Sequence, residues 1–173
     1  MTIRGSCLCG GVTFEIDKAV GPVEYCHCNR CRKVSGSAAL LTIGVNTADY
    51  RLLTGREQIA SYAAPILYEP PAYQASFCRN CGCLVPPADP PGPWFEIPMG
   101  LLDDDPGLLP DKHIFMELAP AWSHMATTLP TYSIRELYKL RTGKELPADF
   151  RLRTHQSASG QKPAGTDVGV PES

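Results

Sequence analysis

The sequence has little that suits a membrane protein or a general nucleic-acid binder. No apolar run approaches the roughly 18 residues of a membrane-spanning helix, and the first residues lack the apolar middle of a signal peptide. Sixteen Lys and Arg against 18 Asp and Glu give a net charge of −2, so the basic excess that binds phosphate backbones is missing. We therefore expect a soluble, cytoplasmic protein whose partners are neither nucleic acid nor a membrane.

The chain also lacks internal repeats and the length for two separate cores. Its 173 residues exceed one domain of roughly 150 residues only slightly. From about residue 155 onward, Ser and Gly are frequent and apolar side chains are few, which is typical of disorder. We expect one domain over residues 1–150 and a disordered tail over residues 151–173.

Eight cysteines are the unusual feature of the composition. They form three clusters, which are Cys7-Leu8-Cys9, Cys26-His27-Cys28-Asn29-Arg30-Cys31 and Cys78-Arg79-Asn80-Cys81-Gly82-Cys83. In a reducing compartment such clusters favour metal ligation over disulfides, and the spacings typical of iron–sulfur proteins are missing. Zinc is therefore the favoured ion, but spacing alone leaves two divisions open: four ligands plus four, or four plus three with one spare.

The local geometry of the cysteine clusters explains how they could bind an ion. In a strand, residues i and i+2 project to the same face, so each C-x-C pair is expected to be a strand-borne pair of ligands. In C-x-x-C the intervening residues form a tight turn whose N–H groups can point at the sulfurs, and Gly82 supplies the permissive backbone. We expect a zinc knuckle from Cys78 to Gly82.

The hydrophobic pattern predicts a mostly β fold with short helices at most. Alternation of apolar and polar residues, or short apolar runs, predicts strands within residues 10–16, 38–44, 50–54, 59–62, 74–77 and 113–118. Prolines throughout residues 85–98 exclude a helix and predict a stiff loop over the site. A short helix is plausible only within residues 129–141.

Four motifs in a fixed order are more specific than any single C-x-x-C. They are G-S-C-L-C-G-G, Y-C-H-C-N-R-C-R-K-V-S-G-S, F-C-R-N-C-G and K-H-I-F-M-E-L-A-P-A-W, and they lie within residues 3–125. Together they resemble the family of glutathione-dependent formaldehyde-activating (GFA) enzymes and their centromere-protein-V-like relatives. The resemblance implies an Mss4-like, or β-tent, zinc-binding fold with two Zn²⁺ ions per chain.

The resemblance also implies how the cysteines divide. The structural zinc of the family carries over to Cys7, Cys9, Cys78 and Cys81. The catalytic zinc carries over to Cys26, Cys28 and Cys31, whose three thiolates leave a fourth position for solvent or an incoming thiol. The implied activity is that of a carbon–sulfur lyase, which adds glutathione to formaldehyde and forms S-hydroxymethylglutathione. A non-catalytic zinc scaffold that binds a protein partner is the alternative.

Several residues near the clusters keep more than one interpretation. Arg32 and Lys33 follow the triplet and are candidates for binding a substrate carboxylate. Cys83 departs from the family pattern, and we favour a spare thiol over a fourth ligand that would close the second site. We expect His27 to point away from the metal, and we favour a packing role over proton transfer for His113 and His124.

Overall fold

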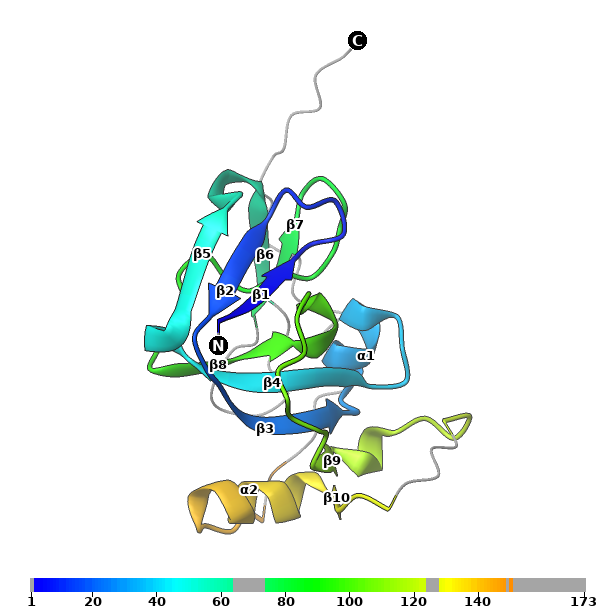
Figure 1. Ribbon diagram of the computed structural model, residues 1–173. Coiled ribbons are helices and arrows are strands. Elements are labelled where there is room, and N and C mark those ends of the chain that lie inside the picture. Colours follow the sequence, from blue (N-terminus) through cyan, green and yellow to red (C-terminus); the bar gives the residue numbers. More distant parts are fainter. Residues whose placement is uncertain (1, 64–73, 124–127, 149, 151–173) are drawn as a thin grey trace.

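The computed structural model in Figure 1 describes residues 2–63, 74–123, 128–148 and 150. Within these ranges the chain forms ten β-strands and two short α-helices, so the predicted mostly β fold is confirmed. No helix in the described part of the chain is both long enough and apolar enough to cross a membrane. The predicted tail over residues 151–173 lies outside the described residues.

The first sheet has three antiparallel strands. They are β1 (Ile3–Ser6), β2 (Thr13–Ile16) and β5 (Tyr50–Thr54), in the order β1-β2-β5. The alternation around β2 is confirmed, because Val12, Phe14 and Ile16 are fully buried. The strand predicted at residues 50–54 is confirmed as the edge of this sheet.

The second sheet has five strands and packs against the first. Its order is β10 (Thr131–Tyr132), β9 (Lys112–Ile114), β3 (Ala19–Cys26), β4 (Leu40–Asn46) and β8 (Trp94–Pro98). The main core lies between the two sheets, where Phe14 meets Ile43 and Ile97. Figure 1 shows β3, β4 and β8 as one layer below β1 and β2.

The prediction of a loop through residues 85–98 is wrong for its last five residues. Trp94–Pro98 forms β8, an edge strand that pairs only with β4 in the described sheet. The alternation explains this outcome, because Phe95 and Ile97 are buried in the core while Trp94 and Glu96 face the other side. Pro98 is tolerated because it ends a strand at the sheet edge.

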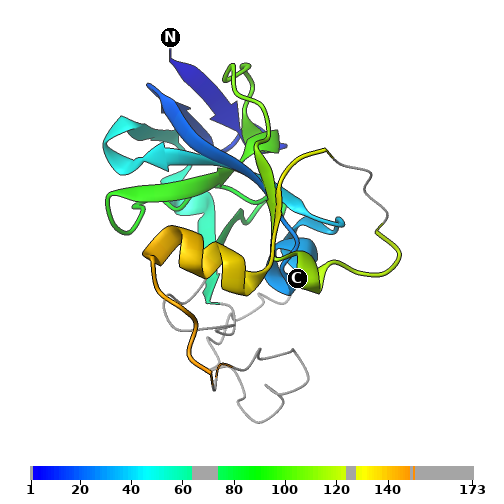
Figure 2. The same ribbon diagram turned by 90° about the horizontal axis from the view of Figure 1, so that it is seen from below.

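A smaller sheet and two helices complete the described chain. The strands β6 (Ile59–Ala63) and β7 (Gln74–Cys78) confirm the two segments predicted at residues 59–62 and 74–77, and they pair with each other. Helix α1 (Asn29–Ser35) follows β3, and helix α2 (Ile134–Thr142) confirms the helix expected near residues 129–141. Figure 2 shows α2 lying across the face of the five-stranded sheet.

The strand predicted over residues 113–118 is shorter than expected. β9 ends at Ile114, because Phe115 adopts a left-handed backbone conformation with φ of 59°. Residues Met116–Leu118 then form a single 3₁₀ turn. Ile114 and Phe115 pack with Ile134 and Leu137 in a second cluster of buried residues, which also contains three cysteines. This cluster joins α2 to the sheet.

Candidate metal centres

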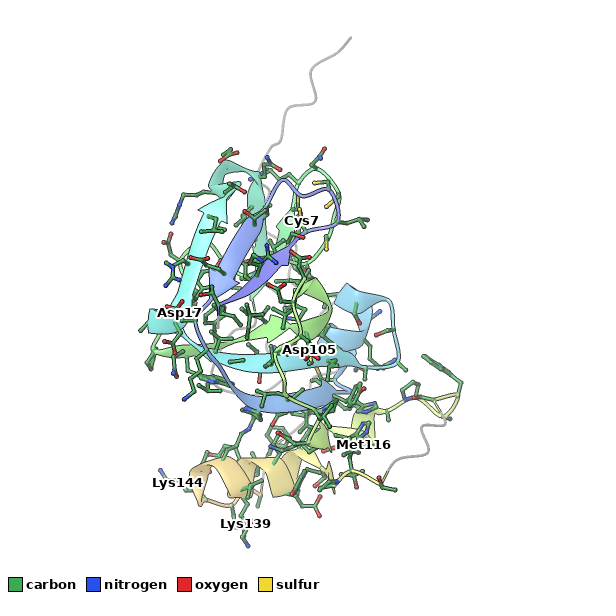
Figure 3. The ribbon with its side chains drawn as sticks, in the orientation of Figure 1. Cys7, Asp17, Asp105, Met116, Lys139 and Lys144 are labelled. Carbon is green, nitrogen blue, oxygen red and sulfur yellow. The ribbon has the colours of Figure 1, made fainter. Side chains whose placement is uncertain are left out.

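The first candidate metal centre brings cysteines of the first cluster together with cysteines of the third cluster. Cys7 and Cys9 lie in the turn after β1, Cys78 ends β7, and Cys81 lies in the turn that follows β7. Their four sulfur atoms all lie within 4.8 Å of one another. Figure 3 shows Cys7 beside further sulfur atoms between these turns. The structure thus brings together residues that are about 70 positions apart in the chain.

Turns position three of these four sulfurs, and the fourth belongs to the last residue of strand β7. The prediction of a strand-borne C-x-C pair is wrong here, because β1 ends at Ser6 and the Gly10 N–H donates to the Cys7 carbonyl at 2.8 Å. The predicted knuckle turn is confirmed: Gly82 has φ of 71°, and its N–H donates to the Cys78 carbonyl at 2.8 Å.

The sulfur spacing fits one tetrahedral ion. Four donors about 2.3 Å from a tetrahedral zinc lie about 3.8 Å apart. The Cys7 and Cys9 sulfurs are 3.5 Å apart, and the Cys9 and Cys78 sulfurs are 3.9 Å apart. Hydrogen bonds from the Asn80 side chain and the Gly11 backbone lower the pKa of Cys9 to about 6, which favours the thiolate that binds a metal.

The second candidate metal centre contains Cys26, Cys28 and Cys31, all of them buried. Their sulfurs also lie within 4.8 Å of one another. The expected strand-borne pair is again wrong, because β3 ends at Cys26 and Cys28 is the N-cap of α1. The Cys28 sulfur accepts a hydrogen bond from the Cys31 N–H at 3.4 Å. A strand end and the first turn of a helix therefore meet at this centre.

The thiols of the second centre differ in the direction in which their pKa values are shifted. Hydrogen bonds from Cys26 and Cys31 hold the pKa of Cys28 far below its ordinary value. The same contact with Cys28, together with burial, raises the pKa of Cys26. Burial and the neighbouring sulfurs therefore oppose ionisation of all three thiols together when no cation is bound. A divalent ion is the partner that would let all three ionise.

The two described histidines near the second centre are engaged with each other. The His27 Nε2 and His113 Nδ1 atoms are 2.9 Å apart, and both side chains are buried. The His113 ring also stacks on Tyr25 at 4.8 Å between centroids. His27 belongs to neither group of close sulfurs, as expected for a ring that points away from them. His124 lies outside the described residues.

The two candidates for binding a substrate carboxylate, Arg32 and Lys33, differ in their contacts and exposure. The Arg32 Nε donates to the His27 carbonyl at 3.3 Å, and its Nη2 donates to Asn29 Oδ1 at 2.6 Å. Arg32 is therefore half-buried against the chain between Cys26 and Cys31, whereas Lys33 is exposed. Of these two residues, Arg32 is the one held against the segment that carries the three cysteines.

Cys83 belongs to neither group of close sulfurs among the described residues. Its carbonyl accepts a hydrogen bond from the Cys78 N–H at 2.9 Å, and its side chain packs against both the main core and the first centre. We therefore predict that Cys83→Ala leaves the metal content per chain unchanged, as measured by elemental analysis of the purified protein. Loss of one ion would identify Cys83 as a ligand.

Comparisons with known proteins identify the family of this chain. A sequence model described as "Glutathione-dependent formaldehyde-activating enzyme" (GFA) matches residues 2–118, which is more than half of the chain. The chain belongs to the GFA family. A curated Halomonas elongata protein named "Putative glutathione-dependent formaldehyde-activating enzyme" is 30% identical over 128 residues, covering 70% of this chain and 80% of that protein.

A crystal structure of a Rhodobacter sphaeroides protein is also similar to this GFA chain. It has a TM-score of 0.45 and 19% identity, over 75% of this chain and 99% of that one. The matched GFA segment contains all eight cysteines but ends before β10 and α2. The helix that covers the second centre is therefore outside the segment that identifies the family.

Sequence reasoning missed a buried polar cluster beside the second centre of this GFA chain. Glu24 on β3 is only 1% exposed, and its carboxylate contacts Arg141 Nη2 at 2.5 Å and Lys112 Nζ at 3.4 Å. Glu96 on β8 lies 4.0 Å from the same Arg141 nitrogen. The alternation in Trp94–Pro98 was the available signal, because it places Glu96 on the face opposite to the core.

Proposed function

We propose that this GFA-family protein is a zinc-dependent enzyme of the carbon–sulfur lyase type, which adds a small thiol to formaldehyde. The observation that carries the proposal is the difference between its two centres. Four sulfurs meet at the first centre, but only three meet at the second among the described residues. A tetrahedral ion held by Cys26, Cys28 and Cys31 keeps one position for a ligand from outside the chain.

The two centres have separate roles in this proposal. Cys7, Cys9, Cys78 and Cys81 hold a structural zinc, because four protein ligands close the coordination sphere. A zinc ion at the second centre supplies a site at which a thiol of ordinary pKa about 8.5 is held as a nucleophilic thiolate. The names of the family and of the H. elongata relative support glutathione as the thiol and formaldehyde as its partner. The product that we propose is then S-hydroxymethylglutathione.

The state of the cysteines supports a reducing site of action. Seven of the eight cysteines lie in two groups of close sulfurs that suit metal ligation, which requires reduced thiols. Reduced thiols persist in the cytoplasm, where glutathione is the main thiol buffer. We infer that the protein acts in that compartment.

Arg32 and Lys33 are the cations proposed to bind a carboxylate of the substrate. Arg32→Ala is expected to raise KM for glutathione about tenfold, because one charge-assisted hydrogen bond contributes about 1.5–3 kcal/mol. The exposed Lys33 is expected to contribute less. Steady-state kinetics with glutathione and with uncharged 2-mercaptoethanol check the assignment, and KM should change only for glutathione. Equal changes for both thiols would count against carboxylate binding.

Exchange spectroscopy tests the proposed function directly. The zinc-loaded protein is mixed with glutathione and formaldehyde, and NMR exchange measurements follow formation of the adduct. We expect the exchange rate to rise in proportion to protein concentration. A rate equal to that of the protein-free mixture would leave the alternative, a zinc scaffold that binds a protein partner.

A further inference from the structure

We propose that a cavity between helix α2 and the five-stranded sheet is a separate binding site, which takes a small aromatic carboxylate. The cavity has a volume of about 380 Å³, in the range of pockets that hold small ligands. Strands β3, β8 and β9 and helix α2 contribute its lining, which contains no cysteine among the described residues. Figure 2 shows α2 lying across this face of the sheet. The inference therefore concerns neither metal centre and does not depend on the proposed function.

One part of the lining is apolar and can contact an aromatic ring. It consists of the Trp94 indole on β8, Pro22 on β3, and Leu137 and Leu140 on α2. Trp94 is 37% exposed and Leu140 is 60% exposed, so a ligand can reach both side chains from solvent. Aromatic rings pack favourably against an indole, and leucine side chains add apolar contact. This part of the cavity favours a planar apolar group.

The backbone of β4 holds the indole of Trp94 in place. Trp94 pairs with Asn46 of β4, and its ring lies over the nearby Gly44. A Cβ atom added at Gly44 would lie 2.7 Å from Trp94 Cζ2 and 2.2 Å from the Gly21 carbonyl oxygen, so only glycine fits there. The indole is therefore packed in position before a ligand arrives, which lowers the entropy lost on binding.

The other part of the lining carries three charged groups that meet at one carboxylate. Arg141 Nη2 lies 2.5 Å from Glu24 Oε2, and Lys112 Nζ lies 3.4 Å from Glu24 Oε1. The Glu24 side chain is 1% exposed, whereas those of Lys112 and Arg141 are 21% and 41% exposed. The carboxylate is therefore covered while the two cations are accessible, so a ligand entering from solvent meets positive charge first.

The charge balance of this lining favours an anion. Two cations share the single carboxylate of Glu24, which leaves one positive charge in excess. Asp111 and Glu96 contact the same cations at 3.0 and 4.0 Å, but they do not line the cavity and both are partly exposed, so water weakens their effect. A ligand carboxylate between Arg141 and Lys112 would balance the excess charge.

The two parts of the lining together define the ligand class. An uncharged ring leaves the two cations without a further partner, and a small inorganic anion leaves the apolar part in contact with water. Phenylacetate combines a ring and a carboxylate in about ten non-hydrogen atoms. For a ligand of this size we expect a dissociation constant of roughly 1 mM or lower.

The indole N–H signal of Trp94 in NMR spectra reports binding in the cavity. The chain has two tryptophans, so Trp122→Phe leaves Trp94 as the single source of an indole signal. In the zinc-loaded Trp122→Phe protein, we expect phenylacetate to shift this signal in a saturable way. Phenylacetamide, which lacks the charge, and acetate, which lacks the ring, should each bind about tenfold more weakly or worse. No saturable shift up to about 20 mM phenylacetate, or equal affinity for phenylacetamide, would overturn the proposal.

Lys112→Gln and Lys139→Gln form a matched pair in the Trp122→Phe background. Lys139 is 65% exposed and pairs with Glu145, and Figure 3 shows it on the side of α2 away from the sheet. We expect Lys112→Gln to weaken phenylacetate binding about tenfold and Lys139→Gln to leave it unchanged, because only Lys112 lines the cavity. Equal effects of the two variants would overturn the assignment of the cavity.

Leu140→Ser tests the apolar part of the lining. Leu140 is largely exposed, so the fold should tolerate the change, and thermal melting checks that it does. Loss of the leucine contact should weaken phenylacetate binding about fivefold. Leu53→Ser on β5, at a comparably exposed leucine outside the cavity, is the matched control and should leave binding unchanged. Wild-type affinity in Leu140→Ser would contradict the proposed ligand position.

A carboxylate can also ligate zinc, so binding at the second centre must be separated from binding in the cavity. Cys28→Ala, which is expected to lose the ion of the second centre, should still bind phenylacetate with unchanged affinity. Loss of binding in this variant would overturn the cavity assignment in favour of the metal. Because none of these measurements uses thiol or formaldehyde, a failure of the proposed function would leave their outcome unaffected.

Discussion

Cys78→Ala is expected to prevent cooperative folding of the chain. Cys78 is fully buried and ends β7, and its sulfur lies 3.9 Å from that of Cys9 in the turn after β1. The apolar cluster around it is small, so the ion itself must hold β6 and β7 to the first sheet. Binding of a structural zinc contributes about 10 kcal/mol or more, which is comparable to the whole stability of a domain.

Thermal melting followed by circular dichroism checks this prediction in buffer that contains zinc. We expect the Cys78→Ala variant to show no sharp transition, and to lose both ions because the second centre forms only in the folded chain. Cys83→Ala is the matched control, since the same substitution five residues later removes a thiol that lies in neither sulfur group. A Cys78→Ala variant that melts within a few degrees of the wild type would contradict the structural role of the first centre.

Cys28→Ala is expected to have the opposite profile, with an intact fold and no catalysis. The second centre lies beyond the main core, which contains none of its three cysteines. Loss of the hydrogen bond from the Cys31 N–H to the Cys28 sulfur resembles loss of an N-cap, which costs about 1 kcal/mol. The melting temperature should therefore fall, through loss of both the N-cap and the bound ion, but a cooperative transition should remain because the main core is intact.

Metal analysis and exchange spectroscopy measure the two remaining consequences of Cys28→Ala. One ion per chain should be lost, because two sulfurs hold a metal much more weakly than three. Formation of the glutathione–formaldehyde adduct should return to the rate without protein. Retention of wild-type acceleration would contradict the assignment of catalysis to this centre.

Local patterns predicted the strands well but not the backbone at the cysteines. The alternation of Val12, Phe14 and Ile16 requires no information from distant residues, so β2 could be predicted directly. A C-x-C pair is compatible with a strand, with a turn or with a helix start. The structure uses a turn at Cys7 and a helix start at Cys28, because the partners that decide between them lie elsewhere in the chain.

The composition of the sites depended on long-range contacts. Spacing alone could not pair the first cysteine cluster with the third, whereas the resemblance did, and the sulfur distances agree with it. Glu96 was missed because Pro93, directly before β8, and Pro98, its last residue, obscured the strand. Its partners Glu24 and Arg141 are far from it in sequence, and α2 lies outside the segment that the family model matches.

X-ray absorption spectroscopy of the zinc-loaded protein, with and without glutathione, tests the central claim most directly. The account predicts four sulfur ligands at one ion and three at the other, with one additional sulfur per chain when glutathione is present. Cys28→Ala should abolish that gain. Four protein sulfurs on both ions before glutathione is added, or a sulfur count that glutathione does not change, would contradict the account.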